Sequence, residues 1–101
     1  FEVEESKLEG YAILSAMLPT YFWFQFQELQ KLGPQIGLNN EETKQSIKQT
    51  LIAAINMYYD SGLPHEEVID LIPVKPISDH EDYIRNCFSE KLLGLYQKIK
   101  P

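Results

Sequence analysis

The sequence predicts an all-α fold, and three observations support that prediction. Apolar residues recur three and four positions apart along most of the chain, which is the period of an amphipathic helix. No segment shows the strict apolar–polar alternation that is typical of a half-buried strand. Prolines and glycine-containing turns divide the 101 residues into segments of ordinary helix length. We therefore expect a single domain, residues 1–101, built as a bundle of about four to five helices.

A proline separates the first two predicted helices. Residues 4–17 have helical spacing and form the first. Pro19 cannot occupy a helix interior without losing a hydrogen bond and clashing with the preceding turn, so we expect it to begin the second helix. That helix is predicted to run to about Leu32, because Gly33-Pro34 and Gly37 then supply stop and turn signals.

Asn39 is a strong signal for the start of the third helix. Its side chain can accept a hydrogen bond from a free backbone amide, and the Glu42 carboxylate can bond back to the Asn39 amide. Ser61-Gly62 is expected to end this helix. Its predicted apolar stripe consists of Ile47, Leu51, Ala54, Ile55 and Tyr58.

Two further helices are predicted on either side of a proline-rich linker. Pro64 opens a short helix that ends near Leu71. Residues 72–77 must be extended, because each proline excludes the helical conformation from the residue before it. Asp79 is the predicted cap of the last helix. The residues expected to be buried near the short helix are Val68, Leu71 and Ile72. The last helix carries apolar residues at helical spacing, which are Ile84, Phe88, Leu92, Leu95 and Ile99.

The charge balance limits the classes of partner. The formal net charge is −6, and the few lysines and arginines are scattered. A nucleic-acid-binding protein or one that binds an anionic membrane surface needs clustered basic residues, so we expect neither partner. No apolar run approaches the roughly 20 residues that span a bilayer.

The single cysteine and the first residue bear on the compartment. Cys87 cannot form a disulfide within the chain, which suits a reducing, cytoplasmic compartment. It lies beside Phe88 on the apolar stripe, so we expect a buried structural thiol. The sequence begins at Phe1 without an initiator Met or a basic leader, and we expect it to be the C-terminal part of a longer protein.

Aromatic residues surround the start of the second helix. The sequence Tyr-Phe-Trp-Phe-Gln-Phe at 21–26 is aromatic around more than one full turn. A helix that is apolar on all sides is normally buried on all sides. About 100 residues in short helices rarely cover one helix completely, so we expect these rings to lie in a homodimer interface. The alternative is a core helix that is covered by its own neighbours.

The sequence contains little that could perform chemistry. No three glycines form a GxGxxG or a phosphate-binding loop, and we expect this segment to bind no cofactor and to contain no catalytic residue. His65, His80 and Cys87 are too few and too dispersed for a zinc site, so no metal is expected. The acids of 79–82 either cap a helix or line a small pocket. Lys75 is held rigidly between two prolines.

The order of these elements resembles the C-terminal dimerisation domain of pyrroline-5-carboxylate reductase. Residues 15–23, Ser-Ala-Met-Leu-Pro-Thr-Tyr-Phe-Trp, keep the serine, proline and tyrosine of the family's Ser-Gly-Ser-Gly-Pro-Ala-Tyr turn in register. The family's Leu-x-x-x-Gly-x-x-x-Gly-Leu is similar to Leu29, Gly33, Gly37 and Leu38. Its Gln-Thr pair is similar to Gln49-Thr50.

The substrate loop departs from the family. The family's Ser-Pro-Gly-Gly-Thr-Thr falls on residues 74–79, Val-Lys-Pro-Ile-Ser-Asp, where both glycines are lost and Asp79 replaces a threonine. Pro76 removes a backbone amide, and Ile77 adds bulk where the family's glycines let amides approach a carboxylate. The resemblance therefore implies an altered substrate. Candidate substrate-binding residues are Ser15, Thr50, Lys75, Ser78 and Asp79.

The resemblance also implies a division of labour between two domains. An N-terminal Rossmann domain would bind NAD(P)H, and the present segment would interleave its helices with those of a second copy and complete a pocket for a small-molecule substrate. The parent would be an NAD(P)H-dependent reductase, although this segment alone would be inactive. The expected interface residues are Pro19, Tyr21, Phe22, Trp23, Phe24 and Phe26.

Two other functions are compatible with the same sequence. One is a dimeric helical scaffold without chemistry, and the other is a regulatory domain that binds a metabolite through Lys75, Asp79 and His80. A strand followed by GxGxxG upstream of Phe1 would favour the reductase, because that motif binds a dinucleotide.

Overall fold

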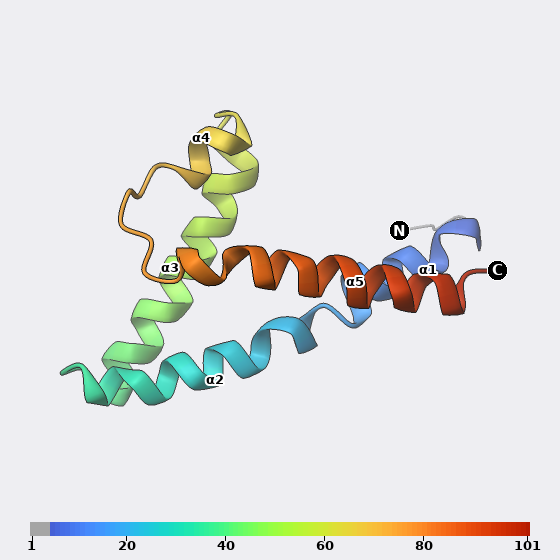
Figure 1. The fold of residues 1–101 in the computed structure, drawn as a ribbon. Helices are drawn as coiled ribbons and strands as arrows, with labels where there is room; N and C mark the ends of the chain where they lie inside the picture. Colours follow the sequence, from blue (N-terminus) through green and yellow to red (C-terminus); the bar gives the residue numbers. More distant parts are fainter. Residues whose placement is uncertain (1–4) are drawn as a thin grey trace. The chain divides into compact units, whose positions relative to one another are not determined.

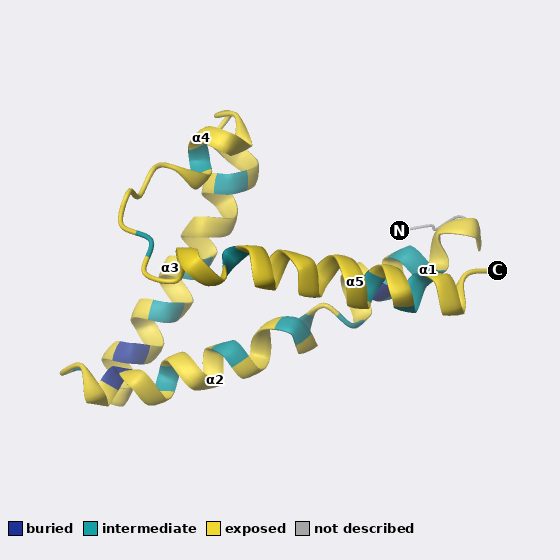
Figure 2. Ribbon diagram, in the orientation of Figure 1, coloured by how far each residue is buried: buried dark blue, intermediate teal, exposed yellow. Residues whose placement is uncertain are grey.

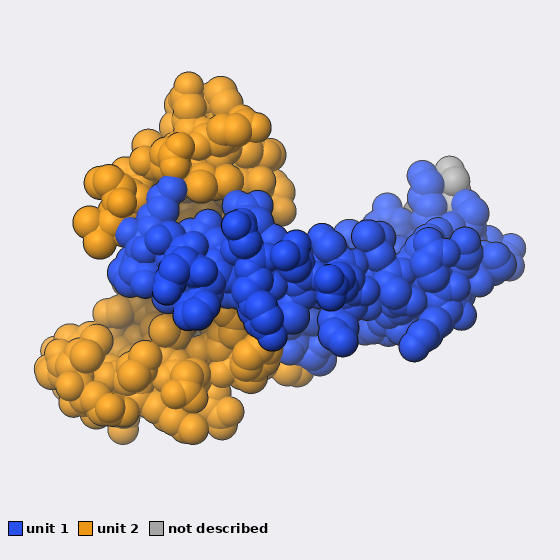
Figure 3. Space-filling model, viewed as in Figure 1, with its two compact units in different colours: residues 1–22, 75–101 blue, residues 23–74 orange. Residues whose placement is uncertain are grey.

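The computed structural model describes residues 5–101, and it confirms the all-α prediction, with no strand in this part of the chain (Figure 1). The chain forms two compact units (Figure 3). Unit 1 comprises residues 1–22 and 75–101, and unit 2 comprises residues 23–74. Helix α2, Pro19–Gln35, begins in unit 1 and continues into unit 2.

The first helical segment of unit 1 changes its winding twice. A 3₁₀ turn at Glu5–Lys7 leads into α1, Leu8–Tyr11, and then into a π-helix at Ala12–Ala16. The prediction of one uniform helix over 4–17 is therefore wrong in its winding, and Glu4 lies outside the described residues. The Tyr21 hydroxyl donates to the Ile13 carbonyl at 2.6 Å. This bond gives a π-helix carbonyl a partner from outside the helix.

Helix α5, Glu81–Ile99, completes unit 1 and contacts α1. Its C-terminal half contributes the half-buried Leu92, Leu95 and Tyr96. The Asp79 cap was predicted wrongly, because the helix is entered through a 3₁₀ turn at Ser78–His80 and His80 is the N-cap. In that turn the His80 amide donates to the Ile77 carbonyl at 3.0 Å, so a backbone bond replaces a side-chain cap.

Helix α2 ends at Gln35, about one turn beyond its predicted end. Pro34 lies inside its last turn, so Gly33-Pro34 is not the stop signal that we expected. Gly37 is the residue that ends the helix, because its φ of +97° is favourable only without a side chain. The Leu38 amide then donates back to the Gly33 carbonyl at 3.0 Å, which is the bond of a Schellman motif.

Gly33 has a different role, at the closest approach of α2 to α3. Helix α3 spans Asn40–Asp60, and its Thr43 is buried against Gly33. A Cβ atom added to Gly33 would overlap the Thr43 hydroxyl and would lie 2.6 Å from its Cβ. The side-chain amide of Gln30 (Nε2) also donates to the Asn40 carbonyl at 2.9 Å across the same turn. Gly33 therefore permits the two helices to meet.

The predicted start of α3 is confirmed in detail. The Glu42 amide donates to Asn39 Oδ1 at 2.7 Å, and the Asn39 amide donates to Glu42 Oε1 at 2.9 Å. These two bonds form a capping box. The helix ends at Asp60, close to the predicted Ser61-Gly62, where Gly62 has a φ of +79°.

Helix α4, His65–Ile69, is shorter than predicted and follows α3 after four residues. The His65 ring stacks on the Tyr58 ring at a centroid distance of 4.1 Å, which joins the end of α3 to the start of α4. The proline-rich segment after α4 contains no helix, but the prediction that all of residues 72–77 are extended is wrong at its end, because Pro76 and Ile77 form a turn and Ile77 has a ψ of 19°.

The single chain buries very little, as Figure 2 shows. Ile13 in unit 1 and Gly33 and Thr43 in unit 2 are the buried residues among 5–101. Several predictions of burial are consequently wrong. Leu71, Ile72 and Cys87 are exposed, and Val68 is only half-buried.

Gly33→Ala should lower the free energy of unfolding by about 1–3 kcal/mol, because the new methyl group overpacks the contact with Thr43. Urea denaturation followed by circular dichroism measures this. Gly94→Ala on α5 is the matched control, since a Cβ there meets nothing within 4 Å and should stabilise the helix by up to about 1 kcal/mol. Equal effects at both glycines would contradict the close approach.

Asn39→Ala should cost about 1 kcal/mol, because it removes the acceptor of the Glu42 amide. Thermal and urea unfolding would measure the loss. Asn40→Ala, at the next position, keeps the capping box and is the control. Unfolding curves identical to those of the parent would mean that the cap contributes nothing.

Candidate dimerisation surface

Ser15, a predicted substrate-binding residue, lines a hollow in unit 1. It belongs to the π-helix Ala12–Ala16 and is exposed. The hollow has a volume of about 630 Å³, and its polar lining includes Lys7, Tyr11 and Tyr96. π-Helices are rare and often occur at functional sites, but no sequence signal predicted this one.

The other predicted substrate-binding residues do not line that hollow. Lys75 is half-buried, and Ser78 and Asp79 are exposed in the turn that precedes α5. Asp79 Oδ2 lies 3.9 Å from His80 Nε2, with both side chains mostly in solvent. Thr50 is exposed in the middle of α3, within unit 2. Within unit 1, the hollow at Ser15 is therefore lined without Lys75, Ser78 or Asp79.

Residues 5–101 contain no group of three or more His, Cys, Asp or Glu side chains that is arranged to hold a metal ion. Within the same residues, no helix combines the length and the apolar character that crossing a lipid bilayer requires.

The aromatic side chains at the start of α2 are the most conspicuous apolar surface. Trp23 is 65% exposed and Phe24 is 63% exposed, and Phe22 and Phe26 each expose about a third of their surface. The helices of unit 2, to which Trp23 and Phe24 belong, therefore do not cover these two rings. Tyr21 differs from them, because its half-buried ring packs edge-on against Phe88 at a centroid distance of 6.1 Å.

A second apolar surface lies in unit 2, between α2 and α3. We call it the α2–α3 groove, and its volume is about 390 Å³. Its floor consists of Phe26, Ile47, Leu51, Ile52 and Ile55, and its polar lining consists of Gln30, Lys44 and Lys48. The helical spacing of α3 predicted most of this floor, but Ile52 and the two lysines were not singled out by the sequence.

The accessible area measures how incomplete the two units are. The chain exposes 8649 Å². Two separate globular domains, each with half of the 11.7 kDa mass, would together expose only about 7,100 Å². Because contact between the units can only reduce the total, the excess of about 1,500 Å² belongs to the units themselves. An obligate interface takes about 1,000–2,500 Å² from each partner, so the excess matches one subunit's share.

Comparison of the chain with protein-family models, with curated proteins and with solved structures finds no match.

Tyr21→Phe should lower the free energy of unfolding by about 0.5–1.5 kcal/mol, because it removes the hydrogen bond to the Ile13 carbonyl and keeps the ring contact with Phe88. Urea denaturation would measure the change. Tyr83→Phe is the control, since the Tyr83 side chain is 72% exposed and its hydroxyl should contribute little. Equal stability of both variants would show that the Tyr21 hydroxyl does not support the π-helix.

Proposed function

We propose that this chain is a homodimerisation domain. The observation that carries the proposal is the apolar surface that neither unit buries, above all Trp23 and Phe24 on α2 and the α2–α3 groove. Exposed apolar patches of this extent are unusual in monomers and mark interaction sites. A second copy supplies equally apolar surface at equal concentration, and closed dimers are the most common assemblies.

Burial of the exposed rings would contribute to the energy of such an association. Complete burial of one large apolar side chain contributes about 1.5–3 kcal/mol. Because about two thirds of Trp23 and of Phe24 is exposed, their burial on both subunits would supply about 4–8 kcal/mol. Association itself costs about 4–15 kcal/mol. The rings at the start of α2 therefore offset part of that cost, and burial of the groove would contribute further.

We further propose that the parent protein is a pyrroline-5-carboxylate-reductase-like, NAD(P)H-dependent oxidoreductase of the cytoplasm, with this segment on the substrate side. The proposal rests on the resemblance described above. It is supported by the position of two family-like residues at helix boundaries, since Pro19 begins α2 and Gly37 ends it. The nucleotide would bind to an N-terminal Rossmann domain, and interleaving of the helices in the homodimer would form a pocket for an altered small-molecule substrate.

One observation favours the alternative of a dimeric scaffold without chemistry. The substrate-loop region presents the apolar side chains of Val74 and Ile77 to solvent, together with Asp79. Sequencing of the coding region upstream of Phe1 distinguishes the two functions. A strand followed by GxGxxG, together with NADPH oxidation by the longer protein, would support the reductase, and the absence of both would leave the scaffold.

Trp23→Ala should weaken dimerisation by about 2–4 kcal/mol, because tryptophan at the centre of an interface is a typical hot spot. Sedimentation equilibrium measures the dissociation constant. Tyr59→Ala is the matched control, since Tyr59 is 71% exposed on α3 and lies outside the groove lining. A parent chain that sediments as a monomer at high concentration would overturn the dimer itself, and an unchanged constant in Trp23→Ala would remove Trp23 from the interface.

A further inference from the structure

We infer that the α2–α3 groove of one subunit receives the N-terminal half of α5, residues 81–90, from a second copy of the chain, with Lys44 and Lys48 facing Glu81 and Asp82. This inference rests on the proposed homodimer. It specifies which segment of the partner fills the groove and which charges select it.

The groove combines an apolar floor with a positive rim. Lys44 and Lys48 lie one turn apart on α3 beside Ile47, Leu51 and Ile52. The ion pairs found among residues 5–101 do not include either lysine. The nearby Glu41 carboxylate instead accepts a hydrogen bond from Gln45 at 3.2 Å. This positive rim favours an acidic partner segment, and a second copy of a chain with net charge −6 can supply one.

The same charges argue against packing of the groove on itself. A twofold axis through the groove would place Lys44 and Lys48 of both subunits, four ammonium groups in all, in one apolar interface whose lining contains no acidic residue. Like charges in such surroundings repel more strongly than in water. The groove therefore requires a different segment of the partner.

The two halves of α5 differ in their contacts and in their charge. The C-terminal half is held in unit 1, where α5 contacts α1 and Leu92 and Leu95 are half-buried. The N-terminal half touches unit 1 through Phe88, whose ring centroid lies 6.1 Å from that of Tyr21, and it carries Glu81 and Asp82 together with Ile84 and Phe88, which are each 36% exposed. Positions three, four and seven residues apart share a helix face, so Glu81, Ile84 and Phe88 lie on one face. This face offers acidic and apolar groups together.

Length and the existing ion pair are also compatible with this docking. Lys44 to Ile55 spans about 16 Å of α3, and residues 81–90 span about 14 Å at 1.5 Å per residue. Arg85 Nη2 lies 3.9 Å from Glu81 Oε1, with the Arg85 side chain 63% exposed. A pair this long and this exposed contributes little, so it does not prevent Glu81 from facing a lysine.

The rival acidic segment is α4, which carries Glu66 and Glu67. It is less suited to reach a second subunit, because four residues join it to α3 and the His65–Tyr58 stack holds it there. The N-terminal half of α5, in contrast, follows a linker without helix over residues 70–77. We therefore assign the groove to α5 of the partner.

Charge reversal with mixing tests this assignment. One variant carries Lys44→Glu and Lys48→Glu, and the other carries Glu81→Lys and Asp82→Lys. Each alone should dimerise at least about 30-fold more weakly than the parent in 0.1 M NaCl, with the difference shrinking to a few-fold in 1 M NaCl because salt screens the repulsion. Mixed in equal amounts, the two should form a heterodimer within about tenfold of the parental affinity, as measured by sedimentation equilibrium and native mass spectrometry.

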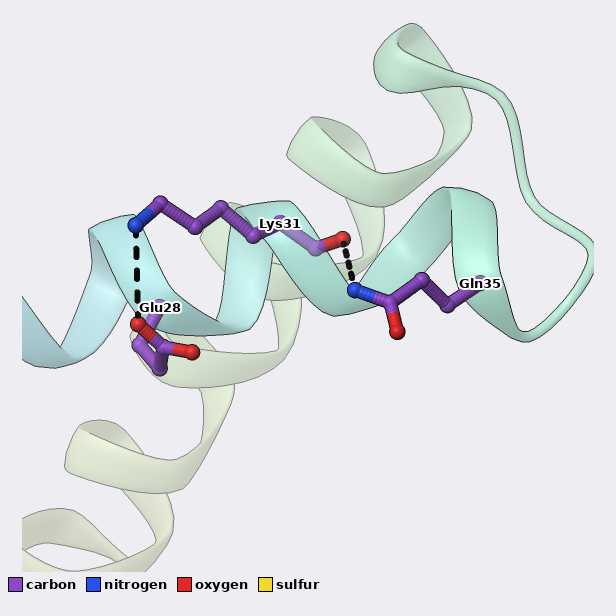
Figure 4. Close-up of polar contacts among 3 residues, drawn as sticks. All are labelled: Glu28, Lys31 and Gln35. Atoms are coloured by element: carbon purple, nitrogen blue, oxygen red, sulfur yellow. Dashed lines mark hydrogen bonds and ion pairs between the residues drawn. The ribbon is translucent and has the colours of Figure 1, made fainter.

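Two matched controls separate the specific contact from net charge. Lys31→Glu with Lys98→Glu changes the net charge as the groove variant does, but Lys31 is 65% exposed, lies 3.8 Å from Glu28 (Figure 4) and lies outside the groove lining. This double variant should dimerise within about threefold of the parent. Glu66→Lys with Glu67→Lys matches the α5 variant in charge, and it should not restore dimerisation when mixed with the groove variant.

Each outcome has a distinct meaning. A monomeric parent overturns the proposed homodimer and this inference with it. A dimeric parent that is unaffected by the groove variant overturns the inference alone. Weakening of each variant without recovery on mixing would mean that the contact does not join two copies in the way we infer. Recovery with the Glu66 and Glu67 variant would assign the groove to α4 instead.

Discussion

Apolar surface on α2 and α3 exceeds what the two units can cover, and this constraint governs the interpretation of the whole chain. Helices are stable when an apolar face is removed from water, and short isolated helices are marginal in water. Here α2 presents Trp23 and Phe24 to solvent, and α3 lines an open groove. This exposed surface is what supports the proposed homodimer, in which a second copy of the chain would cover it.

The close approach at Gly33 explains why the groove exists. Helices with ordinary side chains at their contact lie 8–10 Å apart, and the absence of a side chain at Gly33 lets α3 meet α2 at Thr43. The Schellman bond at Gly37 and the capping box at Asn39 then set the turn between the two helices. With the helices joined at that end, the groove opens along Phe26 and Ile47. The backbone geometry at Gly33, Gly37 and Asn39 thus positions the two helices, and the apolar side chains between them make the groove apolar.

Local signals predicted the helices well, and tertiary features were predicted poorly. Pro19, Asn39 and the Ser61-Gly62 turn mark helix boundaries through backbone chemistry that acts within a few residues, so the sequence alone identifies them. The π-helix had no sequence signal, and its Ile13 carbonyl accepts a hydrogen bond from the hydroxyl of Tyr21, eight residues further along the chain. Burial of Leu71, Ile72 and Cys87 was inferred from apolar stripes. A stripe indicates that burying one face of a helix would be favourable, but it does not indicate whether the same chain or another one buries it. The aromatic start of α2 was predicted to be an interface because it is apolar on all sides. The charges of the groove could be interpreted only once the structure showed which residues line it.

In such an assembly, apolar area would contribute affinity and charge would contribute specificity. The rings of α2 and the floor of the groove supply affinity in proportion to the area they bury, but any apolar helix could cover them. Lys44 and Lys48 restrict the choice, since an uncompensated ammonium at the edge of a dry interface disfavours a basic or neutral occupant. Acids with exposed apolar neighbours flank the proline linker in α4 and at the start of α5, and others occur elsewhere, such as Glu9 beside Leu8 and Glu28 beside Leu29. In the inferred dimer the positive rim would select among these acidic segments, and selection by charge would favour one defined contact over general association.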